Sequence, residues 1–258
     1  MSKTRKPKQK YIYFFVFFIF FIITSVFIYS KYQTNILNSL GEVFFLRLHK
    51  NNYAINILEF NKNKNDTTFF LLGRIYFVKG DLPKSVQQYD KAIEINPNVK
   101  EYYYGRALAY SFASKELLPF ASKDFEKYLT MDEEDFKKTG MHAYGAWAGY
   151  NDLAWTYYLQ KDFKKAEETV KNGLKISGSN AWLLNMYGAI LIEQDKCKEA
   201  LPKLKEAKKL INKTSVEKYG EAYSGDDSKI WSKGKESMEA VINENINYCQ
   251  KTFPQLSN

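Results

Sequence analysis

A pattern of large apolar and small residues recurs along this chain with a period of 34 residues. It occupies residues 66–99, 147–180 and 181–214, and the last two units follow one another without a gap. A period of this length indicates helical hairpins, each of which buries its apolar faces only by stacking on its neighbours. The pattern therefore predicts an all-α chain built as a solenoid of hairpins.

The same eight positions carry the pattern in each unit. In the first unit they hold Phe69, Leu72, Gly73, Tyr76, Ser85, Tyr89, Ala92 and Pro97. The other two units match at seven positions, with Tyr150, Leu153, Ala154, Tyr157, Ala166, Val170 and Gly173, and with Leu184, Tyr187, Gly188, Leu191, Ala200, Leu204 and Ala207. The small residues are expected to let the two helices of a hairpin approach closely. These motifs resemble the tetratricopeptide repeat (TPR) family over about 180 of the 258 residues.

That resemblance implies a right-handed solenoid with three clear hairpins and two degenerate ones. The degenerate units are residues 100 to about 135, with two residues inserted before the second helix, and residues 37–62. An insert at 131–146 begins with the acidic run 132–135, which we interpret as a solvated helix end and turn. After residue 214 the period stops, and a turn-rich segment at 219–227 precedes an expected capping helix from about 228 to 253.

The N-terminal segment has a different character. Residues 1–10 carry five basic side chains and no acid, and residues 11–30 carry no charge over a length that matches the bilayer core. This pattern predicts a transmembrane helix at 11–30; a cleaved signal peptide is the alternative, but its apolar region is shorter. The positive-inside rule then predicts a single-pass protein of the cytoplasmic (inner) membrane, with a cytoplasmic N-terminus, an extracytoplasmic body and the lipid bilayer as a partner.

These features divide the chain into five segments. They are a basic cytoplasmic tail (1–10), a transmembrane helix (11–30), a juxtamembrane segment with a degenerate hairpin (31–65), the repeats (66–214) and a C-terminal capping segment (215–258).

The TPR resemblance also implies a binding groove lined by the first helix of each hairpin. The family's groove positions fall on Phe70, Arg74, Tyr104, Leu108, Phe112, Asn151, Asp152, Trp155, Tyr158, Asn185, Met186 and Ile192. Several of these are types enriched at binding hot spots, although each aromatic ring could equally pack between helices. The Lys, Asn and Arg cluster with which some family members hold a terminal carboxylate is not expected, since only Arg74 and Asn151 are suitably placed. Whether Arg74 pairs with Asp152 or Glu101 is left open.

No signature of an enzyme, a cofactor or a metal site is present. His49 and His142 each stand without a ligand-spaced partner, and lysine-rich stretches alternate with glutamate as on a solvated helix, so nucleic acid is not expected as a partner. Cys197 and Cys249 are expected to lie near one another, either as a disulfide or as two free or buried thiols, of which we favour the thiols.

The sequence predicts a membrane-anchored scaffold that binds a protein or peptide partner in the concave groove. The alternative is a structural subunit of a cell-envelope assembly, in which the groove is merely filled. The identity of the partner, the biological process and the oligomeric state do not follow from the sequence.

Overall fold

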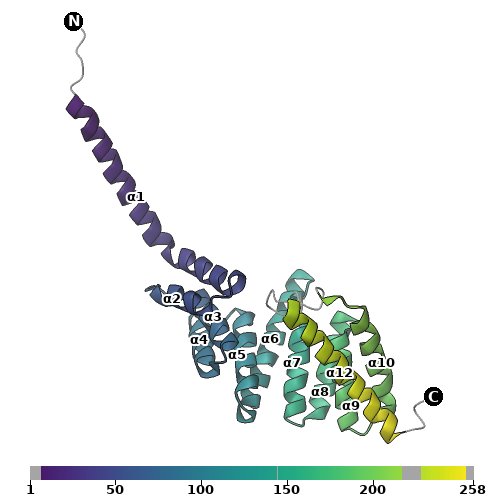
Figure 1. Cartoon of the computed structure of the whole chain (residues 1–258). Coiled ribbons are helices and arrows are strands. Elements are labelled where there is room, and N and C mark those ends of the chain that lie inside the picture. Colours follow the sequence, from purple (N-terminus) through teal and green to yellow (C-terminus); the bar gives the residue numbers. More distant parts are fainter. Residues whose placement is uncertain (1–6, 144, 217–227, 254–258) are drawn as a thin grey trace.

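The computed structural model describes residues 7–143, 145–216 and 228–253, and within these ranges all regular structure is helical. Figure 1 shows a long N-terminal helix that leads into a stack of helical hairpins, with the last helix lying across the far end of the stack. Residues 1–6 of the basic segment and the turn-rich segment at 219–227 lie outside the described residues.

Four hairpins follow one another in chain order, and each helix packs against the next. They are α3 with α4 (Asp66–Val78 and Leu82–Ile95), α5 with α6 (Lys100–Ala113 and Leu118–Thr139), α7 with α8 (Ala146–Leu159 and Phe163–Ser177), and α9 with α10 (Ala181–Glu193 and Cys197–Lys213). These are the three clear units of the 34-residue period and the degenerate second unit.

The turn inside the hairpins is specified locally. Asp81 and Asp162 precede the second helix of their hairpins, and each side chain accepts a hydrogen bond from the backbone N–H three residues later. The residue before each cap, Gly80 or Lys161, has a positive φ (76° and 62°), and Asp195 (59°) takes the same conformation in the last hairpin. A left-handed residue reverses the chain within a few positions, so the second helix returns directly along the first.

Small residues set how closely the paired helices approach. The hydroxyl of Ser85 donates a 2.9 Å hydrogen bond to the carbonyl of Gly73, which places α4 against the backbone of α3. In the last hairpin, a Cβ added at Gly188 would lie 2.4 Å from Leu204. The expected role of the small positions is therefore seen in the packing.

The degenerate second unit forms a regular hairpin, but its first helix makes polar contacts with both neighbouring helices. A short 3-10 helix, η2 (Lys115–Leu117), takes up the extra residues between α5 and α6. Arg106, which departs from the repeat pattern, donates from Nε and Nη2 to the carboxylate of Asp124 at 2.7 and 2.9 Å, and from Nη1 to Asp90 at 2.6 Å. An ion-pair network thus joins α5 to both neighbouring helices, α4 and α6.

The interpretation of the acidic run as a solvated helix end and turn is wrong for Asp132, although the other three residues of the run are partly or fully exposed. Helix α6 continues to Thr139, and the Asp132 side chain is only 2% exposed. Its carboxylate binds Lys100 Nζ at 2.8 Å, the Ala143 N–H at 2.9 Å and His142 Nδ1 at 2.8 Å. Burial raises the pKa of Asp132, but these partners outweigh burial and hold the pKa below its ordinary value. Buried and paired, Asp132 fixes the loop that leads into α7.

A pair of helices precedes the first clear repeat. Helix α1 (Pro7–Glu42) runs through one π-helical turn, η1 (Val43–Arg47), before α2 (Asn51–Phe60) returns along it. Asn38 of α1 donates to Asn65 at 3.0 Å and accepts from Thr68 at 2.7 Å, so the end of α1 is hydrogen-bonded to the start of α3. The degenerate hairpin expected at 37–62 is thus a helical pair packed on α3, while its identity as a repeat stays a prediction.

The predicted membrane segment receives no support. Among the residues that the structure describes, no helix combines the length and the apolar character needed to cross a membrane. The expectation of a single-pass inner-membrane protein, with a cytoplasmic N-terminus and an extracytoplasmic body, is therefore wrong. The transmembrane helix expected at 11–30 and the lipid bilayer as a partner are likewise not supported by the described residues.

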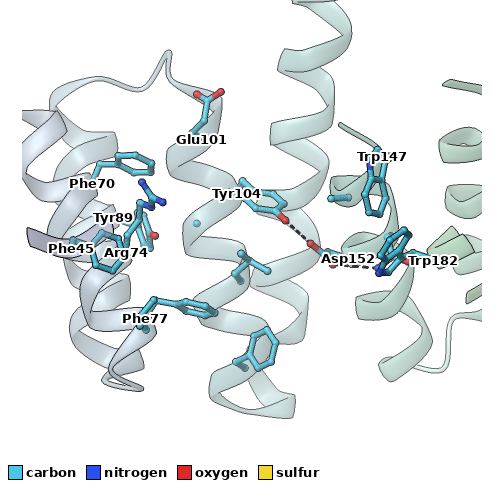
Figure 2. A pocket seen from close by; sticks show the side chains of 16 residues that line it. Phe45, Phe70, Arg74, Phe77, Tyr89, Glu101, Tyr104, Trp147, Asp152 and Trp182 are labelled. Atoms are coloured by element: carbon cyan, nitrogen blue, oxygen red, sulfur yellow. Dashed lines mark hydrogen bonds between the residues drawn. The ribbon is translucent and has the colours of Figure 1, made fainter. Parts of the chain in front are cut away.

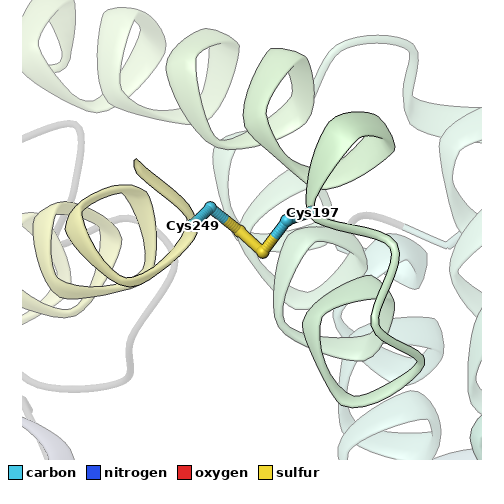
Figure 3. The surroundings of a disulfide bond; sticks show 2 residues. All are labelled: Cys197 and Cys249. Carbon is cyan, nitrogen blue, oxygen red and sulfur yellow. A yellow bond between two sulfur atoms is a disulfide. The ribbon is translucent and has the colours of Figure 1, made fainter. Parts of the chain in front are cut away.

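The C-terminal helix closes the far end of the stack. Helix α12 (Ser228–Thr252) packs on α10 and α9, as expected for a capping helix. Cys249 of α12 forms a disulfide with Cys197 at the start of α10, with the two Cα atoms 5.3 Å apart (Figure 3). Our preference for two thiols was wrong, because the docking of α12 brings the cysteines within bonding distance.

Candidate functional site

A pocket of about 540 Å³ opens across the first helices of the four hairpins (Figure 2). Most of its walls come from α3, α5 and α7, with single residues from η1, α4 and α9. Its lining is mainly apolar and aromatic, which is typical of a binding site that buries an apolar ligand. The pocket therefore crosses the repeats instead of lying within one of them.

Seven of the twelve groove positions implied by the TPR resemblance lie in the wall of this one pocket. They are Phe70, Arg74, Tyr104, Leu108, Phe112, Asn151 and Asp152. They come from three helices that are far apart in the chain. The fold thus brings together residues that, in the sequence, are linked only by equivalent positions in the repeats.

The other five positions lie outside the pocket wall. Trp155 is 43% exposed and stacks on Tyr158, with the ring centroids 5.4 Å apart, and the Tyr158 hydroxyl donates to Glu193 at 2.9 Å. Met186 is buried in the core between α7 and α9, and Ile192 packs against the core beneath α12.

Asn185 is the fifth of these positions. Its side-chain oxygen is buried and has no hydrogen-bond partner among the described residues.

Nine further residues, which the repeat register did not identify, also line the pocket. They are Phe45, Phe77, Val78, Tyr89, Glu101, Gly105, Trp147, Ala148 and Trp182. A signal was available for several of them, because residues three or four apart share a helix face. Val78 follows Arg74 by four residues, and Trp147 precedes Asn151 by four.

Two of these residues reach the pocket for reasons that no spacing reveals. Tyr89 belongs to α4, the second helix of its hairpin, and its ring reaches the pocket past Gly105 of α5. A Cβ at Gly105 would lie 2.4 Å from that ring, so only glycine leaves room for it. Phe45 comes from the π-helical turn that precedes the repeats.

Arg74 is the one basic residue in the pocket wall. Its guanidinium carbon lies 5.4 Å from the ring centroid of Phe45 and 5.6 Å from that of Phe70, in cation–π geometry. Over the described part of the chain it has no ion pair, so neither of the partners considered from the sequence, Asp152 and Glu101, binds it. The faces of these two rings stabilise its charge.

Asp152 faces the pocket from α7 and carries its own hydrogen-bond donors. The Tyr104 hydroxyl donates to it at 2.7 Å, across the space between α5 and α7 (Figure 2), and Asn151 Nδ2 lies 3.5 Å from the other carboxylate oxygen. Burial raises the pKa of Asp152 to about 6, although both hydrogen bonds oppose the rise. This end of the pocket is therefore polar and carries a carboxylate that titrates near neutral pH.

Two tryptophans close the pocket beyond Asp152. Trp147 of α7 and Trp182 of α9 pack with their ring centroids 5.2 Å apart. In the described ranges no group of three or more His, Cys, Asp or Glu side chains could hold a metal ion. Large apolar faces with Arg74 toward one end and the carboxylate of Asp152 toward the other are suited to binding by shape and charge.

Comparison with known proteins identifies the repeat. Residues 73–111 match the TPR repeat family model. The chain is 30% identical to Hsp70-Hsp90 organizing protein 3 of Arabidopsis thaliana over 113 residues, which is 44% of this chain and 18% of that protein. It is 40% identical to BBSome complex member BBS4 of Bos taurus over 48 residues, 19% of this chain and 9% of that protein. The matches thus span less than a fifth of these curated relatives.

Solved structures show the same fold. MamA AMB-1 superimposes with a TM-score of 0.56 at 15% identity, covering 72% of this chain and 96% of that one. MamA 41-end from Desulfovibrio magneticus RS-1 gives 0.54 at 14% identity, covering 69% and 95%. At these identities the likeness concerns the fold alone. Together with the repeat match, it supports the TPR family and confirms the all-helical TPR-like solenoid expected from the sequence.

Proposed function

We propose that this chain is a protein-interaction scaffold that binds a peptide segment of a partner protein in the pocket formed by α3, α5, α7 and α9. The observation that carries the proposal is the pocket itself: about 540 Å³, lined by eight aromatic side chains contributed by η1 and all four hairpins. An occupant of this site would contact several hairpins at once.

The lining favours a peptide on energetic grounds. Phenylalanine, tyrosine and tryptophan offer large contact areas and lose few rotamers on binding, which is why they dominate interface hot spots. Phe112 is 69% exposed and Val78 is 58% exposed, although both line the pocket. Removal of such side chains from water by a ligand lowers the free energy and so favours binding.

The names of the matched relatives agree with such a role. One is an organizing protein of Hsp70 and Hsp90, and the other is a member of a complex. We carry over only the general idea that the matched repeats serve protein association. Within this proposal residues 66–214 are the binding unit, with the helical pair at 31–65 completing one wall through Phe45 and the segment 215–258 capping the other end.

A photo-crosslinking experiment tests whether a protein occupies the pocket. p-Benzoylphenylalanine is placed at Phe112, inside the pocket, or at Phe120, which is also exposed (55%) but does not line it. Irradiation of cells that produce each variant is expected to give a discrete protein adduct at position 112 and none at position 120. Equal labelling at both positions, or none at either, contradicts the proposal.

A second pair of variants shows whether the pocket surface is needed. Val78 and Ile95 are exposed apolar residues at the last position of α3 and α4, and only Val78 lines the pocket. Lysine is favourable at a helix C-terminus, so neither change is expected to unfold the chain. Val78→Lys should weaken the adduct at position 112 at least about tenfold, whereas Ile95→Lys should leave it unchanged.

A further inference from the structure

We propose that the pocket selects a peptide segment with an acidic side chain, whose carboxylate binds Arg74 while neighbouring apolar residues fill the aromatic part of the pocket. This inference rests on the proposed function and adds the chemistry of the partner. It is carried by the position of Arg74 in the wall of the largely apolar pocket, where this cation has no anionic partner among the described residues.

The two arginines that lie on first helices are treated differently. Arg106 on α5 uses three of its nitrogens on the carboxylates of Asp124 and Asp90. Arg74 on α3 is also half-buried, yet among the described residues it has neither a carboxylate nor a hydrogen-bond acceptor. A guanidinium has five N–H donors in a planar fork, and a carboxylate fits that fork with two parallel hydrogen bonds.

The surroundings of Arg74 strengthen its attraction for an anion. The rings of Phe45 and Phe70 occupy positions that water would otherwise hold near the guanidinium. A partly buried cation attracts an opposite charge more strongly than an exposed one, because the local dielectric constant is lower. Stacked arginines are weakly hydrated, so less solvation is lost when the carboxylate arrives.

The other charged groups fix where the acid can lie. Asp152 stands toward the α7 end of the pocket and is already bound by Tyr104, so that end disfavours a second carboxylate. Glu101 is exposed at the start of α5. The acidic residue of the partner is therefore expected at the α3 end, and its apolar residues toward Trp147 and Trp182.

An internal acidic residue fits better than a chain end. Apolar wall continues on both sides of Arg74, with Phe45 from the preceding turn on one side and Leu108 and Trp147 on the other. A segment whose chain ended at Arg74 would leave one of these walls empty. The occupant is thus expected to pass Arg74 in both directions, with an aspartate or glutamate side chain directed at it.

The test is a selection from random twelve-residue peptides displayed with their C-termini fused to a carrier, on the full chain and on two variants. Arg74→Gln removes the cation of the pocket. Lys91→Gln is the matched control, because Lys91 also lies over an aromatic ring, Phe69 at 5.4 Å, but outside the pocket. The wild type and Lys91→Gln should enrich peptides with one acid among apolar residues, and Arg74→Gln should lose that preference for the acid.

An enriched peptide, made with both ends blocked, and its Glu→Gln or Asp→Asn version then complete a double-mutant cycle with Arg74→Gln. Each single change should weaken binding at least about tenfold, and the two together little more than one alone. Selected peptides without acids, an additive cycle, or binding only to peptides with a free C-terminal carboxylate overturn this inference and leave the peptide groove standing. The proposed function itself is overturned if no peptide is selected whose binding is abolished by Val78→Lys.

Discussion

Replacement of Asp152 by asparagine is expected to stabilise the fold, and more so at high pH than at low pH. Asparagine keeps an oxygen that can accept the hydrogen bond from Tyr104, but it carries no charge to bury. The wild-type carboxyl has a pKa of about 6 in the folded chain against an ordinary value of 3.8. The folded state therefore holds the proton more tightly than the unfolded state does, and ionisation of Asp152 opposes folding.

The sign and size of the effect on the free energy of unfolding follow from this difference in pKa. Protonated Asp152 contributes its full stability below pH 3.8, and that contribution is lost as the pH rises through about 6. A pKa difference of this size corresponds to about 3 kcal/mol at most. Roughly half of that loss has already occurred at about pH 5, so the advantage of Asp152→Asn should grow by about 1 kcal/mol between about pH 5 and about pH 8.

Urea unfolding followed by far-ultraviolet circular dichroism, at both pH values, measures this advantage as a difference in the free energy of unfolding. Tyr104→Phe is the companion variant, because it removes a hydrogen bond that opposes the rise in the pKa of Asp152. It should destabilise the chain more at the higher pH. An advantage of Asp152→Asn that is equal at the two pH values would refute the assignment of a half-buried, proton-retaining carboxyl at this position.

Two further predictions concern the frame around the pocket. Asp132→Asn leaves partly buried Lys100 without its buried partner and should cost about 3 kcal/mol or more, whereas Asp135→Asn, at a half-exposed partner 2.8 Å from the same amine, should cost under about 1 kcal/mol; equal losses in thermal or urea unfolding would contradict the burial argument. Cys249→Ser opens a loop of 52 residues and should lower the free energy of unfolding by about 4 kcal/mol, as should a reductant on the wild type; unfolding that a reductant leaves unchanged would argue against the bond to Cys197.

The repeat could be predicted from the sequence because its residues act locally. Gly188 is small because Leu204 of the paired helix lies where its side chain would be, and Asp81 caps the helix that begins beside it. Contacts of this kind recur at every 34 residues and are visible as a period. The capping helix after the last repeat follows from the same reasoning, since the exposed apolar face of the stack needs a cover.

The site could be predicted only in part, since its other residues depend on contacts between units. Tyr89 enters the pocket from a second helix because Gly105 of the next repeat has no side chain. Asp132 lies in a run of acids that resembles a solvated turn, and only the approach of Lys100 from α5 makes it a buried group. Such contacts between units do not recur with the 34-residue period and so cannot be read from it. That Arg74 has no ion-pair partner in the described ranges likewise depends on how several helices pack together.

The contacts between α5, α6 and α7 link the packing of the helices to the shape of the pocket. A longer stretch of chain separates these two helices than separates the other neighbouring first helices, and the pocket crosses the gap between them. Lys100 and Tyr104 lie one turn apart on α5, and they reach Asp132 of α6 and Asp152 of α7. Since Asp132 also holds the Ala143 N–H in the loop before α7, both carboxylates act on the position of α7. The irregular unit therefore helps to set the width of the groove, through the contacts of Asp132 and Asp152.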